Sequence, residues 1–527
     1  MRKPHWLKGN RKVEIPSRMV FVDTESHIEQ VTPKLQDHTL MVGAACYVRT
    51  RNKEGRAVVS EEWTEFRDSV SFWEWVADKC PRRTSVTVFC HNWNYDAGIL
   101  SASDWFLDNG WECTQYVNDK PPFFVKFRKE LRTIRLIDTL NYFMGSVKYI
   151  GDQIGLPKLQ MPEQGATDDE WRTYNRRDVD IIKKATLDFA DFIRERDLGN
   201  WQPTLASQSF AAFRHRFLTE RILIHADQKA CKLERRAYMG GRSECFFLGT
   251  VDGPLYYLDV NSMYPSVMRD REFPTVLEDY IEGGSAGYYK AKRRNHGVIA
   301  DVTIDTREPA YPTRWESRLV FPIGRFDTVL CGDELDRAYE SGLIQRFNRL
   351  AWYKTAPVFK SYVDDLYAAR MEYKAAGNNV FEYLCKLMLN SLYGKFGQNG
   401  HRWQDTDDTT EPFRGFRLVQ ERPGDPIVKE RYRLGVLQRY ARMGESDNSF
   451  PGIAAFVTSY GRAKLWDLIQ KAGNRNVFYV DTDSLIVNRE GCSNLRSDIQ
   501  PTQLGSLKVE QTAHYAIFRG AKDYTID

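Results

Sequence analysis

The chain has 527 residues, 42% of them hydrophobic and 28% charged, with a formal net charge of +4. This length predicts two or more domains with full cores, and so small a net charge confines any basic surface to a local patch. The nine cysteines form no Cys-x-x-Cys pair, which argues against a zinc site and a disulfide framework. No apolar run is long enough for a membrane span or a signal peptide, so we expect a soluble, cytoplasmic protein.

Carboxylates follow two predicted strands in the N-terminal third. Residues 18–23 form a buried-strand pattern that leads into Asp23-Thr-Glu25. Side chains two apart on a strand share a face, so Asp23 and Glu25 can share one cation. A second strand is predicted at 86–90, and Asp96 is expected to place a carboxylate at its end. Taken alone, an Asp-x-Glu is more often a solvated strand end than a metal ligand.

A third predicted strand, 133–138, is followed further along by a helix. The helix begins near Asp168, with acidic residues in its first turn. Tyr174 and Asp178 are four residues apart and lie on one face of this helix. An ordinary pair on the helix surface is an equal alternative.

In chain order these segments resemble the three exonuclease motifs of family B DNA polymerases: Asp-x-Glu, Asn-x-x-Tyr/Phe-Asp and Tyr-x-x-x-Asp. The resemblance implies a ribonuclease-H-like 3′–5′ exonuclease domain, with Tyr174 orienting the attacking water. It implies as ligands of two metal ions Asp23, Glu25, Asp96 and Asp178. It implies as contacts to the DNA strand Asn92, Tyr95, Thr139, Leu140, Phe143 and Lys158.

The middle of the chain contains a glycine turn, a strand end and two helices. A turn is predicted at Tyr238-Met-Gly240-Gly241, because paired glycines permit positive φ and close backbone approach. A strand ends at Asp259. Helical patterns cover 358–374 and 379–396, which together fit a two-helix hairpin.

The second of these helices carries a polar stripe. Lys386, Asn390 and Tyr393 recur at i, i+4 and i+7 and therefore lie on one face. The lysine would supply a positive charge for phosphates and the tyrosine a ring for a base, which suits a surface that binds a nucleotide. A partly exposed helix whose lysine extends along its surface is the structural alternative.

Near the C-terminus, two apolar runs, 477–480 and 485–487, flank Asp481-Thr-Asp483. This pattern predicts a hairpin of buried strands with two carboxylates at its tip. Carboxylates held together repel unless a cation lies between them. With the upstream Asp259, they predict a two-cation site for phosphoryl transfer.

These segments resemble the polymerase motifs of family B, in its small protein-primed branch. The resemblance implies an α/β multidomain protein in which the exonuclease precedes a right-hand polymerase with an α+β palm and helical fingers. Asp259, the Val260 carbonyl and Asp483 are implied as metal ligands, and Asp481 lies beside the primer end. The implied nucleotide-binding residues are Val260, Tyr264, Lys374, Lys386, Asn390 and Tyr393. The implied DNA contacts are Tyr238, Gly240, Gly241, Ser262, Gly394, Thr482, Lys522 and Tyr524.

The same resemblance divides the chain into segments. They are the exonuclease (1–195), linker and first palm segment (196–270), palm with a priming-type insertion (271–357), fingers (358–396), a second insertion of strand-displacement type (397–452) and palm with Lys-x-Tyr (453–527). The family continues into a thumb after Lys-x-Tyr, and we expect no thumb in this chain. Three explanations are left open: the sequence is truncated, a partner supplies the thumb or processivity, or the enzyme has no thumb.

The sequence therefore predicts a template-directed DNA polymerase with a proofreading exonuclease, acting on DNA primer-template and dNTPs. Two Mg²⁺ per active site are expected, with Mn²⁺ able to substitute. Protein-primed replication of a small viral or plasmid genome, with a terminal protein as partner, is favoured; a polymerase that starts from a nucleic-acid primer or from none is the alternative. An inactive DNA-binding scaffold subunit would predict eroded carboxylates, yet all six carboxylate ligands are present.

Overall fold

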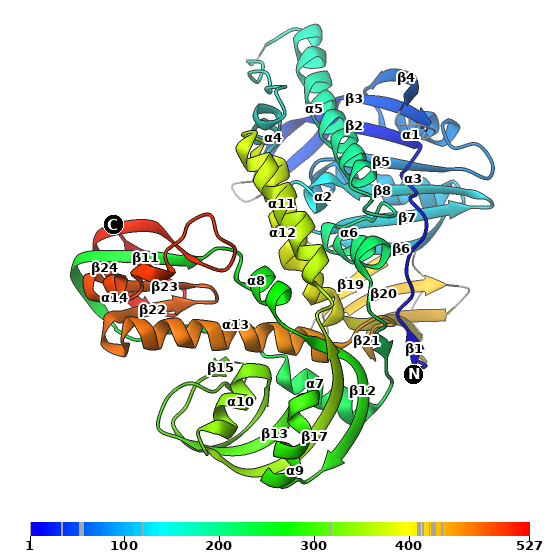
Figure 1. Cartoon of the computed structure of the whole chain (residues 1–527). Coiled ribbons are helices and arrows are strands. Elements are labelled where there is room, and N and C mark those ends of the chain that lie inside the picture. The colour runs from blue at the N-terminus through cyan, green and yellow to red at the C-terminus, as the bar shows by residue number, and fades with distance from the viewer. Residues whose placement is uncertain are drawn as a thin grey trace.

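Figure 1 shows the computed structural model of the chain. The structure describes residues 2–32, 35–51, 57–118, 121–163, 165–316, 318–407, 413, 416–420, 422, 428–433 and 436–527. An N-terminal sheet crossed by a long helix lies opposite a C-terminal sheet, and two paired helices lie between them (Figure 1). Part of the predicted second insertion falls outside the described residues. Within these ranges, no helix has both the length and the apolar character to cross a bilayer.

The N-terminal sheet has seven strands in the order β4-β3-β2-β5-β8-β7-β6. The β2–β5 and β5–β8 pairs are parallel, and the other neighbours are antiparallel. The strands are β2 (Arg18–Thr32), β3 (Leu35–Arg51), β4 (Ala57–Phe66), β5 (Ser85–Cys90), β6 (Glu112–Asn118), β7 (Phe123–Lys129) and β8 (Arg132–Asp138). Helices of this region are α1 (Ser69–Asp78), α2 (Trp93–Ile99), α3 (Ala102–Asp108) and α4 (Val147–Gln153).

The long helix α5 (Asp168–Glu195) confirms the predicted helix start. A capping box begins it, in which the Thr167 side chain accepts the N–H of Glu170 and the Glu170 side chain bonds back to the N–H of Thr167. Its buried side chains join the core that contains Phe21 and Phe89. The helix therefore covers the sheet face on which β2 and β5 present those rings (Figure 1).

A six-stranded antiparallel sheet near the C-terminus has the order β10-β22-β23-β11-β24-β25. The predicted hairpin is confirmed by β22 (Val477–Asp481) and β23 (Ser484–Asn488), whose apolar side chains pack against α13 (Pro451–Ala472). The other strands are β10 (Ser243–Cys245), β11 (Gly249–Val260), β24 (Leu507–Gly520) and β25 (Asp523–Ile526).

The two helices predicted in the middle of the chain are confirmed as α11 (Lys360–Ala375) and α12 (Asn379–Phe396). The Asn378 side chain accepts the N–H of Phe381 at 3.2 Å and caps α12. The Tyr362 hydroxyl donates to the Met388 carbonyl at 2.9 Å and fastens one helix to the other. The Phe381 ring lies 5.8 Å from that of Phe192 on α5, so the pair also contacts the N-terminal unit.

A four-stranded sheet follows β11, with the order β12-β17-β13-β16. It contains β13 (Gly297–Thr306), and helix α10 (Gly332–Glu340) lies beside it. The other strands are β12 (Phe273–Glu282), β16 (Gly324–Cys331) and β17 (Ile344–Ala356). Shorter elements around it are α7 (Gln228–Ala237), α8 (Met263–Asp270), α9 (Ala286–Lys292), β14 (Thr313–Trp315) and β15 (Arg318–Val320).

Another four-stranded sheet follows α12, with the order β18-β21-β20-β19. The strands are β18 (Asn399–Asp405), β19 (Phe416–Val419), β20 (Val428–Arg433) and β21 (Val436–Glu445). The buried Glu430 carboxylate accepts from Arg417 at 2.8 Å and from Arg439 at 2.6 Å. The Arg431 guanidinium lies 4.3 Å from the Trp403 ring. These arginines of the predicted second insertion therefore have partners inside the protein.

Candidate active sites

Three carboxylates meet on the N-terminal sheet. Asp23 and Glu25 of β2 and Asp178 of α5 offer oxygens that all lie within 4.8 Å of one another. The predicted shared face of Asp23 and Glu25 is thus confirmed. Asp178 Oδ1 is buried and has no hydrogen-bond partner among the described residues. An oxygen-only donor set with an unpartnered buried oxygen fits a hard divalent cation.

The fourth predicted ligand, Asp96, lies in helix α2 and not at a strand end, which corrects the prediction. Strand β5 ends at Cys90, and Asn92 then takes a left-handed φ of 78° before the helix begins. The buried Asp138 carboxylate accepts the N–H groups of Asn92 at 2.9 Å and Trp93 at 2.8 Å, which holds this turn. The local sequence pattern gives no sign of this turn, because the carboxylate that holds it, Asp138, belongs to another strand.

Burial and crowding raise the pKa values of these carboxylates. Burial raises the pKa of Glu25 to about 7 and that of Asp96 to about 6. Burial, followed by the charges of Asp96 and Asp178, raises the pKa of Asp23 as well. The Thr24 hydroxyl donates to Asp96 at 2.5 Å, and Asn175 Nδ2 donates to Asp23 at 2.7 Å. A divalent cation bound here would offset the repulsion between these carboxylates.

Cation binding at this site is therefore expected to weaken as the pH falls below about 7. Below the raised pKa values of Glu25 and Asp96, a cation must displace protons, whereas above them it need not. Without cation, the stability that the protonated Glu25 contributes is present below its ordinary pKa of 4.5 and is lost as pH rises through about 7. Calorimetric titration of Mg²⁺ in two buffers of different ionisation enthalpy measures the released protons. Equal apparent enthalpies at pH 6 would contradict the expectation.

Lys158 and Tyr174 lie beside Asp178. The Lys158 ammonium bonds to the Asp178 carboxylate and lies 4.7 Å from the centre of the Tyr174 ring. Burial lowers the pKa of Lys158, but the bonds to Asp178 and Tyr174 outweigh it, so the net pKa is raised. Here the lysine neutralises a site carboxylate, although the sequence predicts it as a DNA contact.

The predicted DNA contacts of this domain divide between surface and interior. The Tyr95 side chain is exposed, and its hydroxyl lies 2.9 Å from His38 Nδ1. Thr139 and Phe143 are buried, with the Thr139 hydroxyl 2.8 Å from His91 Nδ1. Leu140 is half-buried. Thr139 and Phe143 therefore support the site's framework in this structure.

On the C-terminal sheet, Asp259, Asp481 and Asp483 come together as predicted. Asp259 on β11 lies opposite Ser484 on β23, which in turn pairs with Asp481. The Val260 N–H donates to the Asp483 carbonyl at 2.8 Å and ties the two segments together. The tip residue Thr482 has a φ of 60°, a left-handed conformation that is uncommon outside glycine.

Burial, followed by the charge of Asp259, raises the pKa of Asp483 to about 6. Burial also raises the pKa of Asp259, while the charges of Lys508 and Lys386 act against the rise. Lys508 Nζ lies 3.7 Å from Asp259 Oδ1. Two crowded carboxylates with partial cationic compensation make a second oxygen-rich group whose chemistry fits divalent cations.

The Lys-x-Tyr segment lies beside the hairpin tip. Lys522 Nζ is 3.5 Å from Asp481 Oδ2, and the Lys522 N–H donates to the Tyr479 hydroxyl at 2.9 Å. The Tyr524 ring lies 4.6 Å from that of Tyr479. A lysine and a tyrosine are thus placed next to the carboxylate that the sequence assigns to the primer end.

Tyr264 is packed tightly beside this site. Its ring lies 5.1 Å from that of Tyr393. This contact connects the segment after Asp259 with the polar stripe on α12. A β-carbon at Gly241 would lie 2.9 Å from the Tyr264 hydroxyl oxygen and 2.9 Å from Thr482 Cγ2. Only glycine fits there, so the predicted glycine turn closes directly on Tyr264 and the hairpin.

The remaining predicted residues surround this centre. Lys386, Asn390 and Tyr393 are half-buried on α12, as a stripe on one face requires. Lys374 is exposed near the end of α11. A β-carbon at Gly394 would meet no atom within 4 Å, and Gly240 has a φ of 91°. The Tyr238 ring lies against Gly397, where an added β-carbon would be 2.6 Å from Tyr238 Cε1.

Two buried arginines that sequence reasoning missed hold the site together. Arg462 of α13 makes bonds of 2.8 and 2.6 Å to Glu334 and donates to the Gly240 carbonyl at 2.6 Å. Arg370 of α11 donates to the Ser262 hydroxyl at 2.7 Å and to Glu382 at 2.6 Å. A lone arginine within the apolar run 453–469 was the available signal for Arg462.

A second group of potential metal ligands, His225, Cys231 and Glu234, is better described as a buried ion pair. His225 Nε2 lies 2.8 Å from Glu234 Oε1, which also accepts from the Tyr353 hydroxyl at 2.9 Å. Burial lowers the pKa of His225, but the charge of Glu234 outweighs it and raises the pKa to about 10. A protonated imidazole has no lone pair for a metal.

Comparison with known proteins shows what the chain is similar to. Residues 159–408 match the family described as DNA polymerase type B, organellar and viral. A probable DNA polymerase of Neurospora intermedia is 24% identical over 352 residues, which are 61% of this chain and 34% of that protein. The DNA polymerase of Bacillus phage phi29 is 25% identical over 542 residues, covering 96% of this chain and 83% of that protein.

Solved structures show the same fold. The phi29 DNA polymerase complexed with primer-template DNA and incoming nucleotide substrates matches with a TM-score of 0.72 at 19% identity, covering 97% of this chain and 88% of that one. The predicted fold class, an exonuclease unit joined to palm and fingers, is confirmed. The chain spans about a third of the Neurospora relative and half of the polymerase of Enterobacteria phage PRD1. The predicted resemblance to the family B DNA polymerases, in their organellar and viral type, is thereby confirmed.

Proposed function

We propose that this chain is a template-directed DNA polymerase with a 3′–5′ exonuclease. The observation that carries the proposal is the presence of two oxygen-rich carboxylate sites on separate sheets, Asp23–Glu25–Asp178 and Asp259–Asp483. A polymerase that proofreads needs two such sites, because adding and removing a nucleotide require different placement of the DNA 3′ end. Both would use Mg²⁺, for which Mn²⁺ can substitute.

At the polymerase site, Asp259, Asp483 and the Val260 carbonyl would hold two divalent cations. Bound there, the cations lower the pKa of the primer hydroxyl and neutralise charge on the transferring phosphate. Lys386 and Lys374 extend from the paired helices and bind the triphosphate through charge-assisted bonds. Asp481, with Lys522 beside it, holds the primer terminus.

At the exonuclease site, Asp23, Glu25, Asp96 and Asp178 would hold the cations for hydrolysis of the terminal phosphodiester. The Tyr174 hydroxyl orients the attacking water, and Lys158 neutralises Asp178 until the cations bind. Tyr95, the exposed aromatic residue near this site, contacts the frayed strand.

The remaining segments take the roles that the sequence assigns to them. Residues 1–195 form the exonuclease, 358–396 the fingers, and 196–270 with 453–527 most of the palm. The insertion within 271–357 docks a terminal protein that primes synthesis, and 397–452 supports strand displacement. The partners are then primer-template DNA, dNTPs and a protein primer; start from a nucleic-acid primer is the competing form of the same function.

A single gel tests the proposal. A labelled primer annealed to a longer template is incubated with Mg²⁺, with and without dNTPs. Extension with dNTPs and shortening without them is the expected result. A protein that binds the DNA but leaves the primer unchanged in both lanes would instead be a scaffold subunit.

Tyr264→Ala is expected to admit ribonucleotides. The ring is wedged against Tyr393 and Gly241, one turn beyond the metal-binding Asp259, where it can abut the C2′ position of an incoming sugar. The ring would exclude a 2′-hydroxyl by steric repulsion. Truncating Tyr264 should therefore weaken discrimination against ribonucleotides more than it weakens the use of dNTPs. The ratio of rNTP to dNTP incorporation measures it. Tyr264→Phe keeps the ring and serves as the control, and an unchanged ratio in the alanine variant would reject the gate.

A further inference from the structure

A cavity of about 610 Å³ opens on the N-terminal sheet, and none of the site carboxylates lines it. One row of side chains crosses four strands at this cavity. Gln115 of β6 pairs with Lys126 of β7, Lys126 with Arg135 of β8, and Arg135 with Thr87 of β5. Partners in register share a face of the sheet. The row therefore presents an amide, an ammonium, a guanidinium and a hydroxyl to the same cavity.

The two central cations face each other, and neither forms an ion pair within the described residues. Like charges directly opposite on antiparallel strands destabilise a sheet. Both side chains are half-buried, and burial lowers the pKa of Lys126 and of Arg135. Across the described ranges, no carboxylate forms an ion pair with either; Arg135 donates to the Ser85 hydroxyl at 3.3 Å. The Glu14 carboxylate at the rim of the cavity acts on Arg135 only through its charge, and its ion pair is with Lys12 at 3.4 Å.

The third donor of the row is also unsatisfied. Thr87 is 1% exposed, and its hydroxyl oxygen is buried without a hydrogen-bond partner in the described part of the chain. Buried hydroxyl groups in folded proteins are nearly always bonded. Two facing cations that form no ion pair and one unpartnered hydroxyl, all in a single row within the described residues, are the complement of a ligand with several acceptor oxygens and negative charge.

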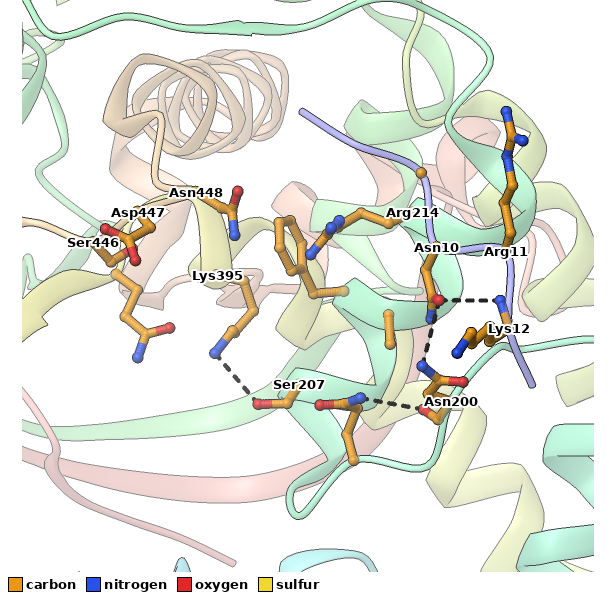
Figure 2. A pocket seen from close by; sticks show the side chains of 15 residues that line it. Asn10, Arg11, Lys12, Asn200, Ser207, Arg214, Lys395, Ser446, Asp447 and Asn448 are labelled. Atoms are coloured by element: carbon orange, nitrogen blue, oxygen red, sulfur yellow. Dashed lines mark hydrogen bonds between the residues drawn. The ribbon is translucent and has the colours of Figure 1, made fainter. Parts of the chain in front are cut away.

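A second basic cavity, of about 750 Å³, adjoins the first and shares Asn200 and Gln202 with it. Figure 2 shows Lys395 reaching Ser207 across it, with Arg214, Arg11 and Lys12 around it. Lys395 Nζ lies 3.4 Å from the Ser207 hydroxyl, and burial lowers its pKa. The row of four donors thus lies in surroundings that are themselves positive, which favours an anion there.

We propose that the row Gln115–Lys126–Arg135–Thr87 is a phosphate-binding site, distinct from both carboxylate sites. A phosphate has acceptor oxygens for all four donors, and its charge turns the Lys126–Arg135 repulsion into shared attraction. The phosphate belongs either to a free nucleotide or to the backbone of a single DNA strand. This inference rests on the row itself and stands independently of the polymerase activity.

The test compares wild type, Lys126→Gln and Lys129→Gln by calorimetric titration in EDTA, which keeps the carboxylate sites free of cations. The probes are inorganic phosphate, dTMP and a short thymidine oligonucleotide. Lys126→Gln should bind about tenfold more weakly, the loss of one charge-assisted bond. It should also melt at a higher temperature than wild type in phosphate-free buffer, because a like-charge pair is gone. Lys129→Gln removes the same charge from the same strand, but its ammonium bonds to the Asn109 carbonyl at 2.7 Å outside the cavity, so binding should not change.

The probes separate the two sources of phosphate. Binding of dTMP and inorganic phosphate that is lost in Lys126→Gln identifies a free nucleotide or phosphate as the ligand. If the affinities of Lys126→Gln and wild type differ for the oligonucleotide alone, the ligand is the backbone of a DNA strand. Equal affinities of wild type and Lys126→Gln for every probe, or no binding to wild type, would overturn the proposal. Should Lys126→Gln fail to fold, Gln115→Leu at the exposed end of the row carries the same comparison.

Discussion

Asp483→Ala is expected to slow nucleotide addition by roughly a thousandfold or more, because losing a ligand to the polymerase cations removes several kcal/mol of transition-state stabilisation. Degradation of single strands should continue, since Asp23, Glu25 and Asp178 meet on another sheet. Primer extension with dNTPs and shortening of a single strand, measured on the same preparation, give both rates.

The matched control is Asp252→Ala, which removes an exposed carboxylate from β11, the strand that carries Asp259. It should extend primers like the wild type. If Asp483→Ala also extends primers near the wild-type rate, the hairpin carboxylates do not hold the catalytic cations.

The double variant Asp23→Ala, Glu25→Ala should show the reverse pattern, with degradation reduced by roughly a thousandfold and extension preserved. Both carboxylates lie on one face of β2, so losing both leaves Asp178 without the other two oxygen donors of its group. The two crowded, proton-holding groups also disappear, so the double variant should be at least as stable as the wild type above pH 7.

Glu29→Ala, at an exposed position further along β2, controls for loss of charge from the same strand. The readout is the rate at which a labelled single strand shortens in Mg²⁺, after purification that separates the variant from host nucleases. Unchanged shortening by the double variant would disprove the N-terminal assignment.

Local sequence pattern predicted the parts of the molecule that depend on neighbours in the chain. The apolar runs around Asp481 and Asp483 became the hairpin, and the acidic first turn after Thr167 became a capped helix. The paired glycines at 240 and 241 predicted a positive φ, which Gly240 adopts. In each case a short stretch of residues carries its own reason for the structure.

What the sequence could not predict depends on pairing between distant segments. Asp96 turned out to be helical because Asp138, on another strand, holds the turn before it. The buried pair Arg462–Glu334 joins residues 128 positions apart. The opposition of Lys126 and Arg135 exists only through the register of β7 on β8, which a single residue of slippage would abolish.

The order of the chain has a consequence for how the molecule is made. The N-terminal sheet and α5 are complete by Glu195, whereas the C-terminal sheet joins β11 to β22, β23 and β24, more than two hundred residues later. Such distant pairing must wait for the last strands to be synthesised, because domains fold as units from the N-terminus and non-local contacts form slowly. On the ribosome, the N-terminal sheet should therefore acquire its shape well before the C-terminal sheet does. Under the proposed function, a nascent or prematurely ended chain would degrade DNA ends before it could extend them.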